Sequence, residues 1–237
     1  MKTGMYIDAR HGMYPSQAWL LSRDETAHIT VPPFSTLYGF VVSADAEQAA
    51  HIIAGQHGAA TSKRLRSVGP GQYFCHATDD EPATLTLDDD DADAQVFAVV
   101  RHGFRGQGLV GGPIEASGRL CYIDNCSDSL LVYPPRRGDP SLNHLSFPAD
   151  VRQSFHIHPS IRLGVVARGA GFACLTDQEI PLTAGTLFCI EERELHRFRT
   201  EDERLDVIAF HPDGDWGPTD QDHPMLNRTY LAAVRHE

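Results

Sequence analysis

The chain has 237 residues, enough for one large domain or two small ones, and its composition of 41% hydrophobic and 22% charged residues is typical of globular proteins. Its formal charge of −12 argues against nucleic acid or an anionic membrane as a partner. Five scattered cysteines, an odd number, argue against a disulfide framework. No run of about 20 apolar residues predicts a membrane span and no signal-peptide pattern is present, so we expect a cytoplasmic protein.

The first half of the sequence consists mainly of predicted strands. Residues 1–25 show no strong periodicity, and we expect them to form an arm that packs on a neighbouring element. Runs at 28–32, 36–42, 72–76, 83–87 and 94–101 are rich in β-branched and aromatic residues between turn residues, which predicts strands. Residues 46–54 are mostly helix-favouring and predict a helix.

A glycine-rich segment separates the two halves. Six glycines and Pro113 lie between residues 103 and 118, which indicates a domain boundary and predicts domains at 1–112 and 113–237. Beyond it the sequence predicts short strands at 121–124, 130–133, 143–147, 152–158, 162–167, 172–175, 186–190, 196–199 and 205–210. Many short strands at close spacing favour an antiparallel barrel or sandwich. The polar, proline-rich tail after residue 211 is expected to wrap the barrel or close its mouth.

The two halves share a short internal echo. Residues 184–189 match residues 70–75, with Gly, Phe and Cys coinciding, and residues 163–166 echo residues 37–42 at a slightly larger offset. We interpret the echo as two copies of one β unit.

Three histidines form the main candidate site. His156 and His158 are separated by one residue on a predicted strand, so their side chains point the same way. His196, on a nearby predicted strand, could complete a metal site with three nitrogen ligands on one face. The alternative is a set of packed or hydrogen-bonded histidines without a metal.

Residues 144–212 resemble the cupin family of small double-stranded β-barrels. The first cupin motif pairs His-x-His with a Glu after three or four residues and a Gly seven residues further on, which is the spacing of His156, His158, Arg162 and Gly169. The second motif has a Gly eleven residues before its His, as Gly185 stands before His196. The resemblance implies an all-β fold of two tandem cupin-type double-stranded β-barrels, jelly-roll-like. The N-terminal barrel would be degenerate, because the echo places no ligand set there.

The sequence departs from the cupin motifs at two places. Arg162 stands where the family has its metal-binding Glu, and a guanidinium stays protonated and is no ligand. Glu191 and Arg193 replace a Pro and a Gly of the second motif, which predicts a different turn before His196. Two interpretations of Arg162 stay open: it faces the barrel interior and binds a substrate carboxylate, or it faces solvent. An arginine facing a metal would need an anionic partner.

Other polar residues near the motifs are weaker candidates. His144 precedes the first motif and His211 follows the second, and either could move a proton or contact substrate. For both, a structural role is the alternative. Glu194 could approach the metal, although a solvated turn explains it more simply.

A site of His156, His158 and His196 resembles the three-histidine metal sites of the iron-dependent thiol and diketone dioxygenases among the cupins. The resemblance implies a divalent metal, Fe²⁺ first and Zn, Mn or Ni as alternatives, and oxygen-dependent oxidation of a small polar molecule, carboxylate-bearing if Arg162 faces the site. The binding partners would be O2 and this small-molecule substrate. Whether two copies of the chain form a homodimer stays open. Two other functions remain: a redox-neutral lyase or isomerase that uses Zn or Mn as a Lewis acid, and a non-catalytic ligand-binding cupin.

Overall fold

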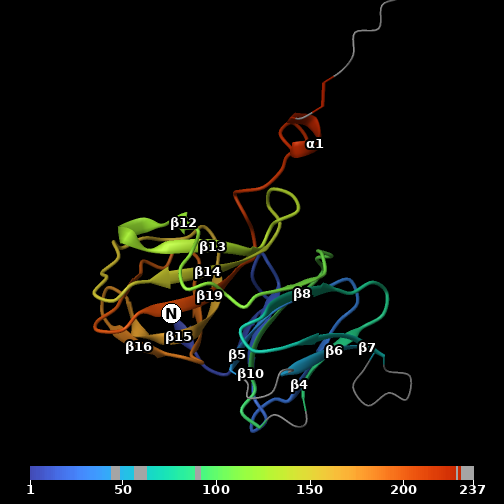
Figure 1. Ribbon diagram of the computed structural model, residues 1–237, viewed down its shortest axis with the longest axis horizontal. Helices are drawn as coiled ribbons and strands as arrows, with labels where there is room; N and C mark the ends of the chain where they lie inside the picture. Colours follow the sequence, from blue (N-terminus) through green and yellow to red (C-terminus); the bar gives the residue numbers. More distant parts are fainter. Residues whose placement is uncertain (44–48, 56–62, 89–91, 228, 231–237) are drawn as a thin grey trace, which may run out of the picture.

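The computed structural model describes residues 1–43, 49–55, 63–88, 92–227 and 229–230. Within these residues the regular secondary structure is almost entirely antiparallel β-strand, which confirms the predicted all-β class. Figure 1 shows two bodies of strands side by side, the first half of the chain in blue to green and the second in green to red. The strands form open sheets of nine, six and four strands.

The first half contains the six-stranded and four-stranded sheets. The six-stranded sheet has the order β11 (Leu109–Gly111), β8 (Tyr73–Ala77), β5 (Thr36–Ser43), β10 (Gln95–Arg101), β3 (Ser16–Leu21) and β2 (Tyr6–Ala9). The four-stranded sheet has the order β4 (His28–Val31), β9 (Ala83–Leu87), β6 (Ala50–Ala54) and β7 (Arg64–Val68). One apolar core, which includes Val41, Ile52, Phe74 and Leu85, fills the space between the two sheets.

The second half is built on the nine-stranded sheet. Its main path is β1 (Lys2–Thr3), β17 (Leu187–Ile190), β15 (Arg162–Cys174), β19 (Leu205–His211), β14 (Ser141–Phe147), β13 (Ser127–Val132) and β12 (Leu120–Cys121). The long strand β15 also pairs with β16 (Glu179–Thr183) and β18 (Arg197–Arg199), which curls the sheet around a second core that includes Phe147, Phe188 and Phe198. A 3-10 turn at Ile123–Asn125 joins β12 to β13.

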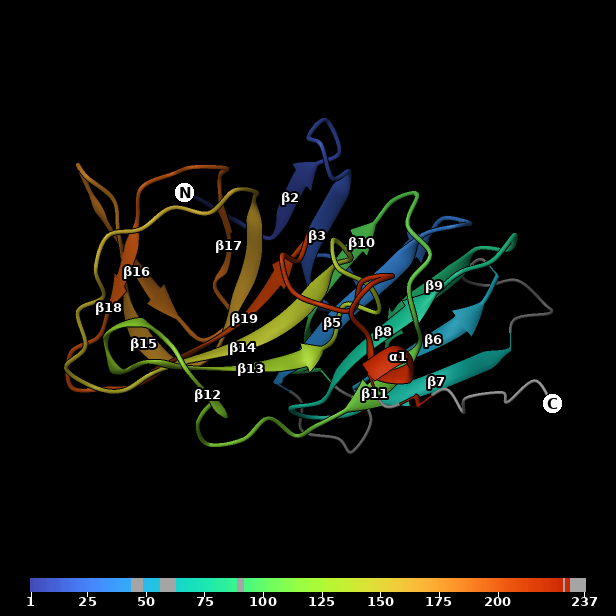
Figure 2. The ribbon, with the colours of Figure 1, turned by 90° about the horizontal axis from the view of Figure 1, so that it is seen from above.

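The two halves share a third core between their sheets. Tyr38 and Phe40 of β5 belong to the same buried cluster as Leu163 of β15 and Phe210 of β19. The rings of Tyr38 and Phe210 lie 5.0 Å apart. Figure 2 shows β5 and β10 of the first half facing β14 and β19 of the second. The strand β1 also crosses between the halves, because Lys2 and Thr3 pair with β17.

The internal echo corresponds to the same strand pair in each half. Gly39 on β5 is the register partner of Phe74 on β8, and Gly164 on β15 is the register partner of Phe188 on β17. A Cβ at Gly39 would lie 2.3 Å from the Phe74 ring, and a Cβ at Gly164 would lie 2.5 Å from the Phe188 ring. Each glycine therefore leaves room for the phenylalanine ring of the neighbouring strand.

Some local predictions were wrong. Residues 50–54 of the predicted helix form β6, because Ala50 and Ile52 are fully buried in the core and β6 pairs with β7 and β9 on its two sides. Residues 46–48 of that prediction lie outside the described residues. The predicted arm at 1–25 instead contains three strands, β1, β2 and β3, with β3 and β2 completing one side of the six-stranded sheet.

The tail differs from its prediction in part. Residues 214–220 contact the loop at 136–139, where Arg137 N donates to Pro218 O and Gly138 N donates to Gly214 O. The short helix α1 (Pro224–Asn227) then points away from both halves (Figure 1). Among the described residues no helix is long and apolar enough to span a membrane. The division at residues 112 and 113 stays a prediction.

Candidate metal centre

The three predicted histidines meet in the second half of the chain. His156 and His196 face each other across an isolated antiparallel bridge, with His156 N donating to His196 O at 2.9 Å and His196 N donating to His156 O at 3.0 Å. Paired residues on neighbouring extended segments carry their side chains on the same face, and His158 joins them because it stands two residues after His156. Residues 152–158, which contain His156 and His158, were predicted to form a strand but make only two isolated bridges, at Arg152 and at His156.

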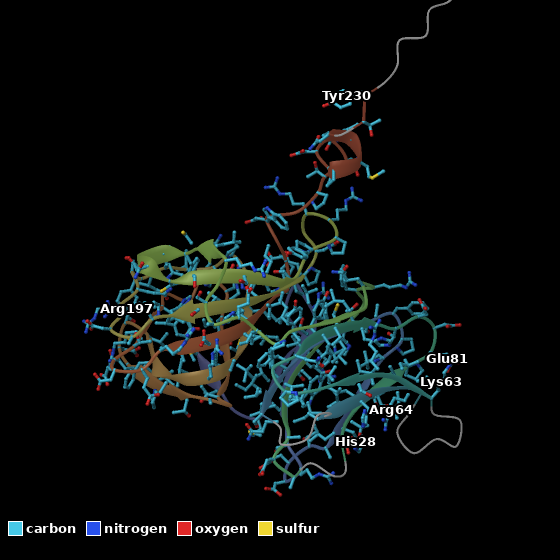
Figure 3. The ribbon with its side chains drawn as sticks, in the orientation of Figure 1. His28, Lys63, Arg64, Glu81, Arg197 and Tyr230 are labelled. Atoms are coloured by element: carbon cyan, nitrogen blue, oxygen red, sulfur yellow. The ribbon has the colours of Figure 1, made fainter. Side chains whose placement is uncertain are left out.

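The rings form a compact triangle. Centroid distances are 5.1 Å between His156 and His158, 4.5 Å between His156 and His196, and 5.0 Å between His158 and His196. One nitrogen of each ring lies within 4.8 Å of the other two, and these three residues form a candidate metal-binding group. Arg197, the residue after His196, lies in the second half of the chain, on the side of the molecule opposite His28 and Arg64 (Figure 3).

Backbone carbonyls determine which nitrogens are available. His156 Nδ1 donates to Ser154 O at 2.9 Å, and His196 Nδ1 donates to Glu194 O at 2.8 Å. A carbonyl oxygen only accepts, so each Nδ1 carries the proton and each Nε2 keeps a free lone pair. His196 Nε2 is buried and has no hydrogen-bond partner in the described structure. A buried unpaired nitrogen is costly, and a metal ion would satisfy it, so the donor set fits a divalent metal.

Burial also favours neutral ligands. Desolvation lowers the pKa of His158 to about 3, with further contributions from Arg162 and the other two histidines. Desolvation lowers the pKa of His196 to about 4, although its bond to the Glu194 carbonyl opposes that change. Both imidazoles are therefore neutral near pH 7, the form that binds metals.

A cavity of about 60 Å³ adjoins the histidines, room for a few water molecules or a small ligand. Its walls come from β13, β14, β15, β17, β18 and β19 and from the turns that join them. The apolar lining side chains are Leu145, Phe147, Phe188, Ile190, Phe198, Val207 and Ala209. The polar lining side chains are about as numerous, namely Tyr122, Asp128, Asn143, Gln153, His156, His158, Arg162 and His211.

Arg162 faces this cavity rather than solvent, and its exposed fraction is 7%. Its Nη1 donates to Ser160 Oγ at 2.6 Å and to the carbonyl oxygens of Ser160 and Ile161. The expected anionic partner is Asp213, whose Oδ1 lies 3.7 Å from Nη1. Burial lowers the pKa of the guanidinium and Asp213 opposes that change. Arg162 Nε is buried and has no hydrogen-bond partner among the described residues, so this edge of the guanidinium can bind an acceptor.

Comparisons with known proteins identify the fold that carries this site. Residues 139–220 match the family model of the AraC-like ligand binding domain, and a search of curated proteins found no match. Among solved structures, a cupin 2 conserved barrel domain protein from Leptotrichia buccalis is similar with a TM-score of 0.58 and 11% identity, over 90% of this chain and 98% of that chain. The chain has the cupin fold.

Two other cupins of similar fold are enzymes. Oxalate decarboxylase from Bacillus subtilis, a protein with Mn(II) centres, has a TM-score of 0.52 and 10% identity over 90% of this chain and 73% of that chain. The G106A mutant of salicylate 1,2-dioxygenase from Pseudoaminobacter salicylatoxidans, in complex with gentisate, has a TM-score of 0.53 and 12% identity over 83% of this chain and 68% of that chain. At these identities the similarity establishes the cupin fold alone.

The two other candidate histidines, His211 and His144, lie in different cavities of the structure. His211, the last residue of β19, lines the cavity with its ring 6.5 Å from that of His158. Desolvation holds the pKa of His211 well below its ordinary value, and Arg162 and His158 lower it further. His144 does not line this cavity. Its neighbours Asn143 and Leu145 on β14 do, and side chains alternate between the faces of a strand, so His144 lies on the opposite face.

Glu194 is not part of the histidine group. Its Oε2 accepts from Glu191 N at 2.9 Å and its Oε1 accepts from the amino group of Met1, so the side chain stabilises the turn before His196. Burial would raise the pKa of Glu194, but these two bonds outweigh it and lower the pKa. Arg193 adopts a φ of 56° where the second cupin motif has a glycine.

Two polar residues of the cavity were not predicted from the sequence. Asp128 on β13 and Asn143 on β14 lie in the same wall, and Asn143 Nδ2 donates to Asp128 Oδ2 at 3.0 Å. Burial raises the pKa of Asp128, and its Oδ1 is buried without a partner in the part of the chain that the structure describes. Their positions follow from the register between β13 and β14, in which Leu130 pairs with Asn143 and Asp128 pairs with Leu145. No local motif encodes that register.

Proposed function

We propose that this chain is a metal-dependent cupin enzyme that binds one divalent metal through His156, His158 and His196. The observation that carries the proposal is the arrangement of these rings, two of which are oriented by backbone carbonyls, around a buried and unpaired His196 Nε2. A structural histidine cluster without a metal would leave that nitrogen unsatisfied.

Iron(II) is the proposed metal, and the proposed reaction class is oxidation of a small molecule with O2. When bound, the metal would supply Lewis acidity and redox activity, and three neutral ligands would leave its double positive charge uncompensated. Zn, Mn or Ni are the alternatives for the same donor set. The protein supplies the remaining elements of the site.

Arg162 would orient the substrate. Its Nη1 is fixed by Ser160 and Ile161, and its unpaired Nε can donate to one oxygen of a carboxylate. A guanidinium fixed in this way positions a planar anion at low entropic cost. His211 and Asp128 line the same cavity and are the residues proposed to hold or move a proton. The phenylalanines of the lining exclude water and strengthen these contacts.

The structural neighbours support a small carboxylate as substrate. Gentisate, bound to the salicylate dioxygenase, and oxalate, the substrate in the name of the decarboxylase, both carry carboxylates. A cavity of about 60 Å³ with one cation, Arg162, suits a compact anion. We also propose that residues 1–112 and 113–237 are two cupin units, because the Gly39–Phe74 and Gly164–Phe188 pairs repeat the same contact. The first unit would support the second.

A non-catalytic ligand-binding role is the second candidate. Residues 139–220, which contain all three histidines, match the AraC-like ligand binding domain. In that case the cavity would bind the same kind of small anion without converting it.

Metal content and O2 uptake distinguish the candidates. Protein purified without oxygen is expected to contain one iron per chain and to consume O2 when small carboxylates are added. A His156→Ala/His158→Ala variant should lose the metal and the O2 uptake, whereas His11→Ala, which changes an exposed histidine outside the site, should keep both. Tight zinc or manganese with turnover but no O2 uptake would indicate a lyase or isomerase. Carboxylate binding that persists in the double variant, without turnover, would indicate the ligand-binding role.

A further inference from the structure

A second and larger cavity lies against the face of β13 and β14 opposite to the metal centre. It has a volume of about 540 Å³. Its lining comes from both halves of the chain and from the segment between them, and consists of Tyr73, Gly112, Pro113, Ile114, Glu115, Arg119, Leu120, Ser129, Leu130, Leu131, Tyr133, His144 and Trp216. A volume between about 300 and 1,000 Å³ is usual for small-molecule sites.

Strand alternation places the two cavities back to back. Asp128 on β13 and Asn143 on β14 line the metal-site cavity, whereas the residues that follow them, Ser129 and His144, line the second cavity. Ser129 and His144 are register partners, so their side chains share one face of the sheet.

His144 is a buried polar residue that can make one more hydrogen bond. Its exposed fraction is 0%, and its Nε2 lies 2.9 Å from Asp206 Oδ1, while its Nδ1 is buried and has no partner in the described structure. Leaving such a nitrogen unpaired is unfavourable. A hydroxyl group would satisfy Nδ1, because a hydroxyl both donates and accepts.

Ionic contacts fix the segment that covers the second cavity. Asp206 is fully buried and pairs with Arg168 at 2.6 Å and with Arg204 at 2.8 Å. The same two arginines donate to the carbonyl oxygens of Glu115 and Ala116, respectively. Figure 2 shows the segment between β11 and β12 running beside β13, and Arg119 N donates to Ser129 Oγ at 3.0 Å. The cavity wall is therefore anchored to the residues that orient His144.

Three aromatic rings also line the second cavity. Tyr133 and Trp216 have exposed fractions of 56% and 58%, and their ring centroids lie 6.3 Å apart. Tyr73, from β8 of the first half, adds a third ring. Exposed aromatic side chains that line one cavity with a buried polar group are typical of sites for ring compounds.

We propose that this second cavity binds a small ring compound that carries a hydroxyl group. The hydroxyl would bond to His144 Nδ1, and the ring would contact Tyr133 and Trp216. The site is separate from the metal centre and does not depend on the reaction proposed there.

The test uses the full chain with ¹⁵N-labelled histidine, and follows the ring nitrogens by NMR while phenol, cyclohexanol or toluene is added. Phenol should shift the His144 signals saturably, and toluene, which lacks the hydroxyl, should bind at least several-fold more weakly. Saturable shifts with cyclohexanol as well would show that any ring alcohol fits, and shifts with phenol alone would restrict the ligand to phenols. The His144 signals are assigned by their loss in a His144→Gln variant.

Variants locate the site without disturbing the buried cluster. Tyr133→Ala and Trp216→Ala should weaken phenol binding about 3- to 10-fold, as expected for loss of one aromatic contact. Tyr230→Ala, which removes an exposed ring on the tail, should change nothing, and His156→Ala/His158→Ala should retain full binding. The proposal is wrong if neither alcohol shifts His144, which would mean that the cavity holds only water. It is also wrong if both aromatic variants bind phenol as well as the unaltered chain, or if the shifts occur at His156 and His158 instead.

Discussion

Arg162, which lines the metal-site cavity, forms an ion pair with Asp213 of the tail, with Arg162 Nη1 3.7 Å from Asp213 Oδ1. Ser160 Oγ donates to the same carboxylate, so three residues connect the segment after the histidine pair to the tail. In this arrangement Asp213 occupies a position beside Arg162 that a substrate carboxylate would also seek.

Removing the Asp213 charge should therefore improve anion binding. In Asp213→Asn the guanidinium loses its internal anion, and metal-free protein should bind a small carboxylate such as acetate or benzoate about 3- to 10-fold more tightly, a change of roughly 1 kcal/mol. Arg162→Met should weaken the same binding. Isothermal titration calorimetry measures both, with Asp220→Asn, an exposed partner of Arg136, as the control. Unchanged affinity in Asp213→Asn would show that Arg162 does not bind the anion.

Adding the metal should stabilise the fold. The three histidines already converge, so binding requires little rearrangement, and a ligand at 100 times its Kd contributes about 2.7 kcal/mol. For a chain of this length that corresponds to a rise in Tm of roughly 5–10 °C. Thermal unfolding with and without Fe²⁺ under argon, or with Zn²⁺, measures it. His196→Ala should abolish the rise, and a rise that survives this variant would place the metal elsewhere.

Asp206 should make stability depend on acid pH. Burial would raise the pKa of Asp206, but hydrogen bonds from His144, Arg204 and Arg168 outweigh burial and hold that pKa well below its ordinary value. The unfolded chain then binds a proton at a higher pH than the folded chain, so this stabilisation is complete above about pH 4–5 and is lost as the pH falls further. Breaking a buried charge pair costs about 3–5 kcal/mol, so Asp206→Asn should lower the free energy of unfolding by that amount at pH 7.

Urea unfolding at pH 7 and pH 3 measures that effect. The difference between Asp206→Asn and the unaltered chain should shrink at pH 3, while Asp177→Asn, at an exposed position, should match the unaltered chain at both values. An equal deficit at both pH values would indicate lost packing rather than lost charge.

The two repeated glycines permit a matched comparison. Gly39→Ala and Gly164→Ala each place a methyl group against a phenylalanine ring, and such overpacking costs about 1–3 kcal/mol. Both variants should show lower urea midpoints. Only Gly164→Ala should also weaken metal binding, because Phe188 lines the metal-site cavity whereas Phe74 belongs to the core of the first half. Restored stability in Gly164→Ala/Phe188→Leu would confirm the contact, and equal metal affinity in both glycine variants would contradict the prediction.

The histidine group was predictable because its geometry is encoded locally. His156 and His158 lie on the same side of an extended segment, and motif spacing adds His196. The direction of Arg162 was not predictable, because it depends on Asp213 in a tail with no periodic pattern. Asp128 and Asn143 were missed for a related reason: their position in the cavity depends on how β13 pairs with β14.

The error at residues 46–54 has a different cause. Alanine favours helix in isolation, but Ala50 and Ile52 are buried between neighbouring strands, and burial outweighs a propensity of a few tenths of a kcal/mol per residue. The order and type of most strands followed from composition and turn residues alone. The pairing of β1 with β17 had no signal in the sequence.

That pairing has a consequence for how the chain folds. Lys2 is the register partner of Cys189, so one edge of the nine-stranded sheet is completed by residues that lie 187 positions apart in the sequence. Contacts between such distant residues form late, because closing a long loop is entropically costly. During synthesis β1 would stay unpaired until the ribosome has made β17. A fragment beginning at residue 113 would lack β1 and would expose β17 as an open edge able to pair with other chains.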